Sequence, residues 1–189
     1  MIVHFIRHGL SKANVNSEYS RPDVDLIDIK VKIRPELEKA KRFVEDHKVD
    51  KYIVSPYLRA IRTAEYLGIR EYEIDERIRE VDMGIITGLS EKEALEKHPD
   101  IMKKFFQDRV NFRIPQGESM FDVYKRVSNF LNDLSDEEGE IIVVSHYVAM
   151  VSAASWTVDN INLSESFSVK NGGRLTIKKT KDRKCILFD

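Results

Sequence analysis

The sequence predicts a single α/β domain over residues 1–189. It should have three layers, with helices on both faces of a mostly parallel central sheet and an antiparallel strand at the sheet edge. Two observations support this fold class. The 189 residues match the length of one ordinary domain, and short apolar runs alternate with segments of helical periodicity. Hydrophobic residues make up 42% of the chain and charged residues 33%, which suits a packed core under a solvated surface.

In the first half of the chain, residues 2–6 form an apolar run with β-branched members, as is typical of a buried central strand. A helix is predicted over residues 35–47, because Pro35 suits a first helical turn and apolar residues follow at helical spacing. Residues 52–55 predict a second strand, and the segment from 56 to about 67 predicts the helix that follows it.

In the second half, a capping-box pattern at Ser90 opens a helix, and residues 119–134 have the apolar spacing of a long amphipathic helix. A third buried strand over residues 140–144 runs straight into another helix. The period then changes, and three short strands are predicted at 166–169, 175–179 and 185–188. The links between these last strands are too short for crossovers, so we expect antiparallel pairing there.

Chemically active residues follow each of the three main predicted strands. Arg7 and His8 come after the first strand, Arg59 after the second and His146 after the third. Because ligands bind beyond the carboxyl ends of parallel strands, we expect these side chains to share one site. Arginine is a planar, permanently charged donor suited to phosphate, so this set predicts an anion pocket.

Five motifs occur along the chain in a fixed order. They are Arg7-His8-Gly9 with Ser11 and Asn14, the segment 55–64 around Arg59, Arg79-Glu80 with two following glycines, Gly117-Glu118-Ser119, and Ser145-His146. Together they resemble the histidine phosphatase superfamily, the phosphoglycerate-mutase-like proteins, and most closely its RHG-motif phosphatase branch. The resemblance spans residues 7–146 and implies the phosphoglycerate mutase-like fold.

The resemblance also implies a mechanism. His8 would attack the substrate phosphorus and form a phosphohistidine. Arg7, Arg59 and His146 would hold the phosphoryl oxygens, with Asn14 as a further donor. Glu80 would protonate the leaving oxygen and later deprotonate water. Glu76 and Asp82 are close enough in sequence to compete for that role. No metal ion is expected, because the arginines neutralise the charge.

Several residues keep more than one interpretation. Ser11 is either a phosphate ligand or a turn and capping residue. His4 shares a strand face with His8 but suits a buried, hydrogen-bonded histidine, and Arg62 suits a solvated cation. Leu10 replaces a polar residue usual in the family. Tyr147 replaces a glycine, which puts bulk and a hydroxyl on the substrate side, where it is a candidate for substrate binding.

The most favoured function is hydrolysis of a small phosphomonoester. The alternative is a cofactor-dependent phosphoglycerate mutase that interconverts 3- and 2-phosphoglycerate, in which case 2,3-bisphosphoglycerate would act as primer; otherwise no cofactor is expected. A mutase needs extra cations over the site, and here Lys103, Lys104, Arg109 and Arg113 are scattered. A non-catalytic phosphate-binding module is the third hypothesis, and the presence of both His8 and Glu80 argues against it.

Charge and composition bear on partners and location. The formal net charge of −1 argues against nucleic-acid binding, and the longest weakly polar stretch is too short for a membrane span. With one cysteine, no internal disulfide is possible. We therefore expect a cytoplasmic protein that acts on a small phosphorylated substrate as a monomer or homodimer.

Overall fold

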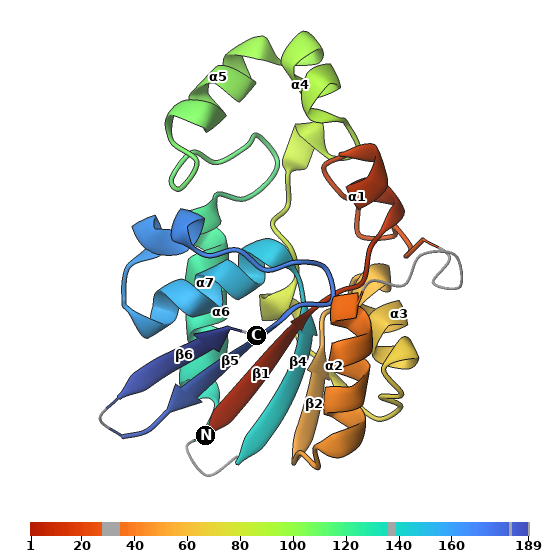
Figure 1. Ribbon diagram of the computed structural model, residues 1–189. Helices are drawn as coiled ribbons and strands as arrows, with labels where there is room; N and C mark the ends of the chain where they lie inside the picture. Colours follow the sequence, from red (N-terminus) through yellow and green to blue (C-terminus); the bar gives the residue numbers. More distant parts are fainter. Residues whose placement is uncertain (28–34, 136–138, 182, 189) are drawn as a thin grey trace.

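The computed structural model describes residues 1–27, 35–135, 139–181 and 183–188, which form a sheet with helices on both faces (Figure 1). In chain order its strands are β1 (Ile2–Arg7), β2 (Lys51–Val54), β3 (Glu73–Ile74), β4 (Glu140–Ser145), β5 (Arg174–Lys179) and β6 (Lys184–Phe188). Its α-helices are α1 (Lys12–Asn16), α2 (Pro35–Asp46), α3 (Leu58–Tyr66), α4 (Glu91–Lys97), α5 (Pro99–Gln107), α6 (Met120–Asp133) and α7 (Tyr147–Thr157). The described ranges also contain three short 3-10 helices: η1 (Glu76–Ile78), η2 (Gly84–Ile86) and η3 (Ile161–Ser166).

The sheet confirms the predicted fold class. Its strand order is β3-β2-β4-β1-β5-β6. The first four strands in that order are parallel, and β5 runs antiparallel to both of its neighbours, so the antiparallel pairing lies at one side of the sheet. In the register of β1 with β4, Arg7 lies opposite Ser145. The motif that begins at Arg7 and the motif that begins at Ser145 therefore start at neighbouring positions on adjacent strands.

The layers follow from the alternation of side chains along the central strands. On β4, Ile141 and Val143 pack into one core with α6 and α7, whereas Ile142 and Val144 pack into a second core with α2 and α3. Helices α4 and α5 lie beyond the carboxyl ends of the strands (Figure 1). They enclose a third, smaller apolar cluster that includes Met102. This cap stands over the sheet edge at which the site was predicted.

One predicted strand is wrong, and one short strand was not predicted. Residues 166–169 form the end of η3 and irregular chain rather than a strand. Their carbonyls serve side chains at the sheet edge: Phe167 O accepts from the Tyr147 hydroxyl at 3.1 Å, and Val169 O accepts from Arg7 Nη1 at 2.5 Å. The strand β3 was missed, because two exposed residues carry no periodic signal.

The helix predictions agree with the structure to within two residues at most of the ends. The capping box predicted at Ser90 is confirmed, and a second one, which was not predicted, occurs at Ser119; each serine side chain accepts from the backbone N–H three residues on. Among the described residues, no helix is both long and apolar enough to cross a membrane.

We expect Phe130→Ala to lower the free energy of unfolding by about 3–5 kcal/mol, because this ring is 1% exposed and the shortened side chain would leave a cavity against Phe5. Urea unfolding followed by circular dichroism measures the change. Phe121→Ala on the same helix is the matched control, since that ring is 40% exposed and should cost less than about 1 kcal/mol. Equal losses in the two variants would contradict this assignment of the core.

Candidate active site

The site is assembled by hydrogen bonds between the carboxyl ends of three adjacent strands. The His8 N–H, just beyond β1, donates to Ser145 O at 2.9 Å, and the Ser55 N–H, just beyond β2, donates to Val144 O at 3.0 Å. These backbone bonds hold the residues after β1, β2 and β4 at one edge of the sheet. The side chains of His8, Arg59 and His146 meet there and are at most 2% exposed.

The His8 ring presents one defined nitrogen to the site. Its Nδ1 lies 2.6 Å from Gly9 O, and because a carbonyl can only accept, Nδ1 must carry the hydrogen. Its Nε2 therefore keeps a lone pair, to which Arg59 Nε donates at 3.3 Å. Burial, reinforced by the charges of Arg59 and Arg7, holds the pKa of His8 well below its usual value. The ring is neutral, with a nucleophilic nitrogen at Nε2.

The two arginines are anchored by backbone carbonyls. Arg59 Nη1 donates to Arg21 O at 2.8 Å, and the Arg59 side chain is almost fully buried. Arg7 Nη1 donates to Val169 O, and its guanidinium lies 4.9 Å from the centre of the Tyr147 ring. Rigidly held guanidinium groups beside a neutral histidine form a site prepared for an anion.

His146 lies beside His8 at the start of α7. The two ring centres are 5.1 Å apart, and His146 Nε2 lies 2.7 Å from the Ser55 hydroxyl. Burial, with Arg59 as the next cause, holds the pKa of His146 well below its usual value. The site thus contains two neutral histidines side by side.

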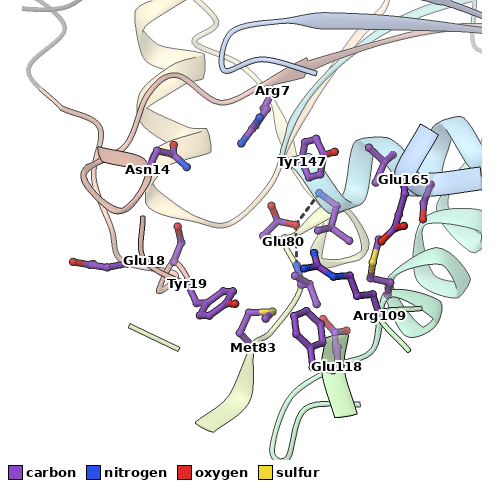
Figure 2. Close-up of a pocket in the computed structure, with 17 residues that line it drawn as sticks. Arg7, Asn14, Glu18, Tyr19, Glu80, Met83, Arg109, Glu118, Tyr147 and Glu165 are labelled. Carbon is purple, nitrogen blue, oxygen red and sulfur yellow. Dashed lines mark hydrogen bonds between the residues drawn. The ribbon is translucent and has the colours of Figure 1, made fainter. Parts of the chain in front are cut away.

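Asn14 is oriented by three donors on its side-chain oxygen. These are Ser11 N at 3.1 Å, Ser11 Oγ at 2.9 Å and Asn171 Nδ2 at 3.1 Å. The amide nitrogen of Asn14 is thereby left to face the cavity (Figure 2). Ser11 is the N-cap of α1, and its hydroxyl donates to Asn14 Oδ1 and accepts from the Asn14 N–H. The structure therefore favours the capping interpretation of Ser11 over that of a direct phosphate ligand.

Among the three neighbouring acids, Glu80 is the one that lines the same cavity as Arg7 and Asn14. Its Oε1 accepts from the backbone N–H groups of Val81 at 3.0 Å and Val148 at 3.1 Å (Figure 2). Glu76 is 74% exposed and lies elsewhere, and the Asp82 carboxylate accepts from a backbone N–H outside the cavity.

Sequence reasoning missed residues that hold the site together. Arg126, in the middle of α6, donates to the carbonyls of Arg77, Arg79 and Glu80 at 2.7, 2.7 and 3.1 Å. Its Nε also donates to Glu118, whose carboxylate binds Arg79 as well. The Gly-Glu-Ser motif pointed to Glu118. Arg126 has no comparable signal, because in sequence it resembles any cation on an amphipathic helix.

Asn171 was also missed. This buried residue donates from Nδ2 to His8 O at 3.2 Å and Gly9 O at 3.3 Å, in addition to Asn14. It precedes β5, so the C-terminal part of the chain supports the first motif. Only the antiparallel pairing of β5 with β1 brings it there.

A cavity of about 470 Å³ lies at this edge of the sheet (Figure 2). Among the described residues, its lining includes Arg7 and Tyr147, the chain neighbours of His8 and His146, but neither histidine. Arg7, Asn14, Glu80 and Tyr147 line one end. The rest is lined by the segments after α1 and before η2, by α5 and the chain after it, and by the start of α6, α7 and η3. The side chains are Glu18, Tyr19, Ser20, Val81, Met83, Phe105, Arg109, Glu118, Met120, Val148, Val151, Ser164 and Glu165. A phosphoryl group near His8 would therefore leave room for a small leaving group under the cap.

Two residues singled out earlier lie outside this site. His4 is buried near the amino end of β1, where its nitrogens lie 2.9 Å from Thr176 Oγ1 and 2.6 Å from Glu140 Oε1. Arg62 is on the surface and pairs with Glu65 at 2.9 Å. Across the described ranges, no cluster of three His, Cys, Asp or Glu side chains has the arrangement of a metal site.

The chain was compared with protein families and with known proteins. A family model described as "Histidine phosphatase superfamily (branch 1)" matches residues 3–187. Phosphoserine phosphatase 1 of Hydrogenobacter thermophilus is 30% identical over 135 residues, which cover 69% of this chain and 63% of that protein. Human 6-phosphofructo-2-kinase/fructose-2,6-bisphosphatase 1 is 24% identical over 159 residues, which cover 83% of this chain and 32% of that protein. The chain thus spans less than two thirds of either relative.

Among solved structures, the alpha-ribazole phosphatase from Shigella flexneri superposes with a TM-score of 0.88 at 19% identity, covering 100% of this chain and 95% of that chain. At this identity the likeness shows a shared fold.

The lowered pKa of His8 and of His146 predicts an acid-sensitive fold. Unfolded histidines bind protons near pH 6.5, whereas these two bind them only at lower pH when folded. Their contribution to stability is complete above about pH 6.5 and falls below it, by up to about 1.4 kcal/mol per pH unit for each histidine. Urea unfolding at pH 7.5, 6.5 and 5.5 measures this slope. The double variant His8→Gln/His146→Gln should show a shallower slope, and an unchanged slope would contradict the assignment.

Proposed function

The chain belongs to the histidine phosphatase superfamily, and from this premise and the site geometry we propose that it hydrolyses a small phosphomonoester through a phosphohistidine, without a metal ion. The observation that carries the proposal is the state of His8. Its hydrogen lies on Nδ1, its lone pair lies on Nε2, and two guanidinium groups and a second histidine surround it. A neutral nucleophile in a cationic pocket is suited to attack at phosphorus.

In the first step, His8 Nε2 forms a bond to phosphorus as the bond to the leaving oxygen breaks. Glu80 donates a proton to that oxygen, so the product leaves as an alcohol. Arg59 Nε, which now donates to Nε2, would donate to a phosphoryl oxygen instead. Arg7, Asn14 and His146 would hold the remaining oxygens and spread the transition-state charge.

In the second step, water attacks the phosphorus of the phosphohistidine. Glu80 takes a proton from this water, the bond from phosphorus to His8 breaks, and inorganic phosphate leaves. The backbone N–H groups of Val81 and Val148 donate to Glu80 Oε1 and hold the carboxyl group in place in the cavity. His8 returns to its starting state.

The site supports hydrolysis of a phosphomonoester better than the phosphoglycerate mutase reaction. A mutase must retain a bisphosphorylated intermediate, which calls for cations around the leaving group. Of the four candidates, Arg109 lines the cavity, whereas Lys103 and Lys104 are exposed on α5 and Arg113 pairs with Asp122 at 2.8 Å. We therefore propose no cofactor, and a 2,3-bisphosphoglycerate primer belongs only to the mutase alternative.

The substrate is proposed as a class, because the relatives are named for different phosphate esters. The assay panel should hold phosphoserine, fructose 2,6-bisphosphate, α-ribazole 5′-phosphate and 3-phosphoglycerate. Phosphorus NMR separates the outcomes. Release of inorganic phosphate supports the proposal, and formation of 2-phosphoglycerate from 3-phosphoglycerate primed with 2,3-bisphosphoglycerate would replace it with the mutase.

We expect His8→Ala to lower turnover of p-nitrophenyl phosphate by on the order of 10³-fold or more, because no nucleophile remains. Wild-type protein quenched in base during turnover should carry one phosphoryl group by mass spectrometry, and the variant none. His47→Ala is the control, since His47 is an exposed residue at the end of α2. Undiminished turnover by the His8 variant would rule out the covalent route.

We expect Glu80→Gln to slow hydrolysis of alkyl phosphates by roughly 10²–10⁴-fold, because these leaving groups need a proton. Hydrolysis of p-nitrophenyl phosphate should fall much less, since nitrophenolate leaves without one. Steady-state kcat/KM on both substrates measures the contrast. Glu76→Gln is the matched control on the same loop. Equal losses on both substrates would remove Glu80 from the acid role.

A further inference from the structure

Ser55 is a buried hydroxyl residue to which the proposed mechanism gives no task. It follows β2 directly, is 0% exposed, and belongs to the second sequence motif. Its Oγ lies 2.7 Å from His146 Nε2, and the backbone N–H of Tyr57 donates to the same Oγ at 3.4 Å. The hydroxyl therefore has one partner that is certainly a donor and one whose role depends on the histidine tautomer.

The hydrogen-bond requirements of this group decide the tautomer. The Tyr57 N–H can only donate, so it uses a lone pair of Ser55 Oγ, and the Ser55 hydrogen still needs an acceptor. Among the described residues, the only acceptor recorded for it is His146 Nε2. If Nε2 carried the imidazole hydrogen instead, the Ser55 hydrogen would be left buried without an acceptor, which is unfavourable.

The other ring nitrogen of His146, Nδ1, gives a second observation that does not depend on Ser55. His146 is 0% exposed, and within the described part of the chain its Nδ1 has no hydrogen-bond partner. Buried polar atoms without partners are rare and point to a missing ligand. The ring lies 5.1 Å from the His8 ring, so an oxygen of a phosphoryl group on His8 suits this nitrogen.

We propose that Ser55 is a positioning residue that donates to His146 Nε2 and so keeps the imidazole hydrogen on Nδ1, where it donates to a phosphoryl oxygen. This inference rests on the proposed function, because the acceptor is the transferred phosphoryl group. The low pKa of His146 agrees with it, since a neutral ring has only one hydrogen to place. Without the Ser55 hydroxyl, that hydrogen is free to move to Nε2, and the donor at Nδ1 is lost.

The direct test is nitrogen NMR of the intact protein labelled with ¹⁵N-histidine, without phosphate, at pH 8. Long-range proton–nitrogen spectra distinguish a protonated ring nitrogen from a bare one, and loss of signals in His146→Gln assigns the ring. We expect wild-type His146 to be protonated at Nδ1 and bare at Nε2. A ring protonated at Nε2 would overturn the proposal whatever the protein catalyses, and this measurement needs no variant of Ser55 to fold.

In Ser55→Ala, we expect the Nδ1 hydrogen to be lost in part or in full to Nε2, and binding of inorganic phosphate by calorimetry to weaken roughly tenfold or more. Ser55→Thr, which keeps a hydroxyl, should restore both properties. Ser152→Ala is the matched control, because this fully buried serine on α7 has a hydroxyl without a described hydrogen-bond partner. An unchanged tautomer in Ser55→Ala would contradict the proposal.

The outcomes separate this inference from the proposed function. If the tautomer and phosphate binding respond as expected but no phosphomonoester is hydrolysed, Ser55 organises a phosphate site and the hydrolase proposal fails. If phosphomonoesters are hydrolysed while His146 is protonated at Nε2 in the wild type, the hydrolase proposal stands and the role of Ser55 is wrong.

Discussion

The parallel pairing of β1 with β4 is the constraint on which the site depends. Because Arg7 lies opposite Ser145, the residues that follow each strand emerge side by side. The hydrogen bond from His8 N to Ser145 O extends the ladder by one step beyond β1. A slip of β1 by one residue would exchange the two faces of β1 and move His8 relative to His146. The apolar alternation that builds the two cores therefore also sets the geometry of the site.

The same burial that aligns these groups creates an electrostatic imbalance. Two neutral histidines and the cation Arg59 are packed where water has little access. Burial first, and the charge of Arg59 second, lower the pKa of both histidines and keep them unprotonated. Such an arrangement costs stability and is relieved by an anion. The hydrogen bonds at each ring then decide which nitrogen is used: Gly9 O directs the His8 lone pair to Nε2, and we infer that Ser55 directs the His146 hydrogen to Nδ1.

Residues distant in sequence stabilise this edge from outside. Arg126 holds the loop that carries Glu80 by binding its carbonyls, and Asn171 binds the chain at His8 and Asn14. Arg126 belongs to a helix on one face of the sheet, whereas Asn171 precedes an antiparallel strand on the far side of β1. The residues that hold the site in place are therefore spread over the fold. The short sequence motifs contain only the groups nearest to the proposed phosphoryl position.

The sequence by itself determined the fold class and the strand ends from which the site is built, because apolar periodicity reports which face of an element is buried, and chain order places His8 and His146 after parallel strands. It did not distinguish between Ser11 as ligand and Ser11 as cap, nor did it find Arg126 or Asn171. The carbonyl partners of Arg126 lie 46–49 residues away and the partners of Asn171 lie 157–163 residues away, whereas the role of Ser11 depends on the direction of one hydrogen bond. Only the tertiary structure decides such contacts, since local patterns carry no record of what packs against them.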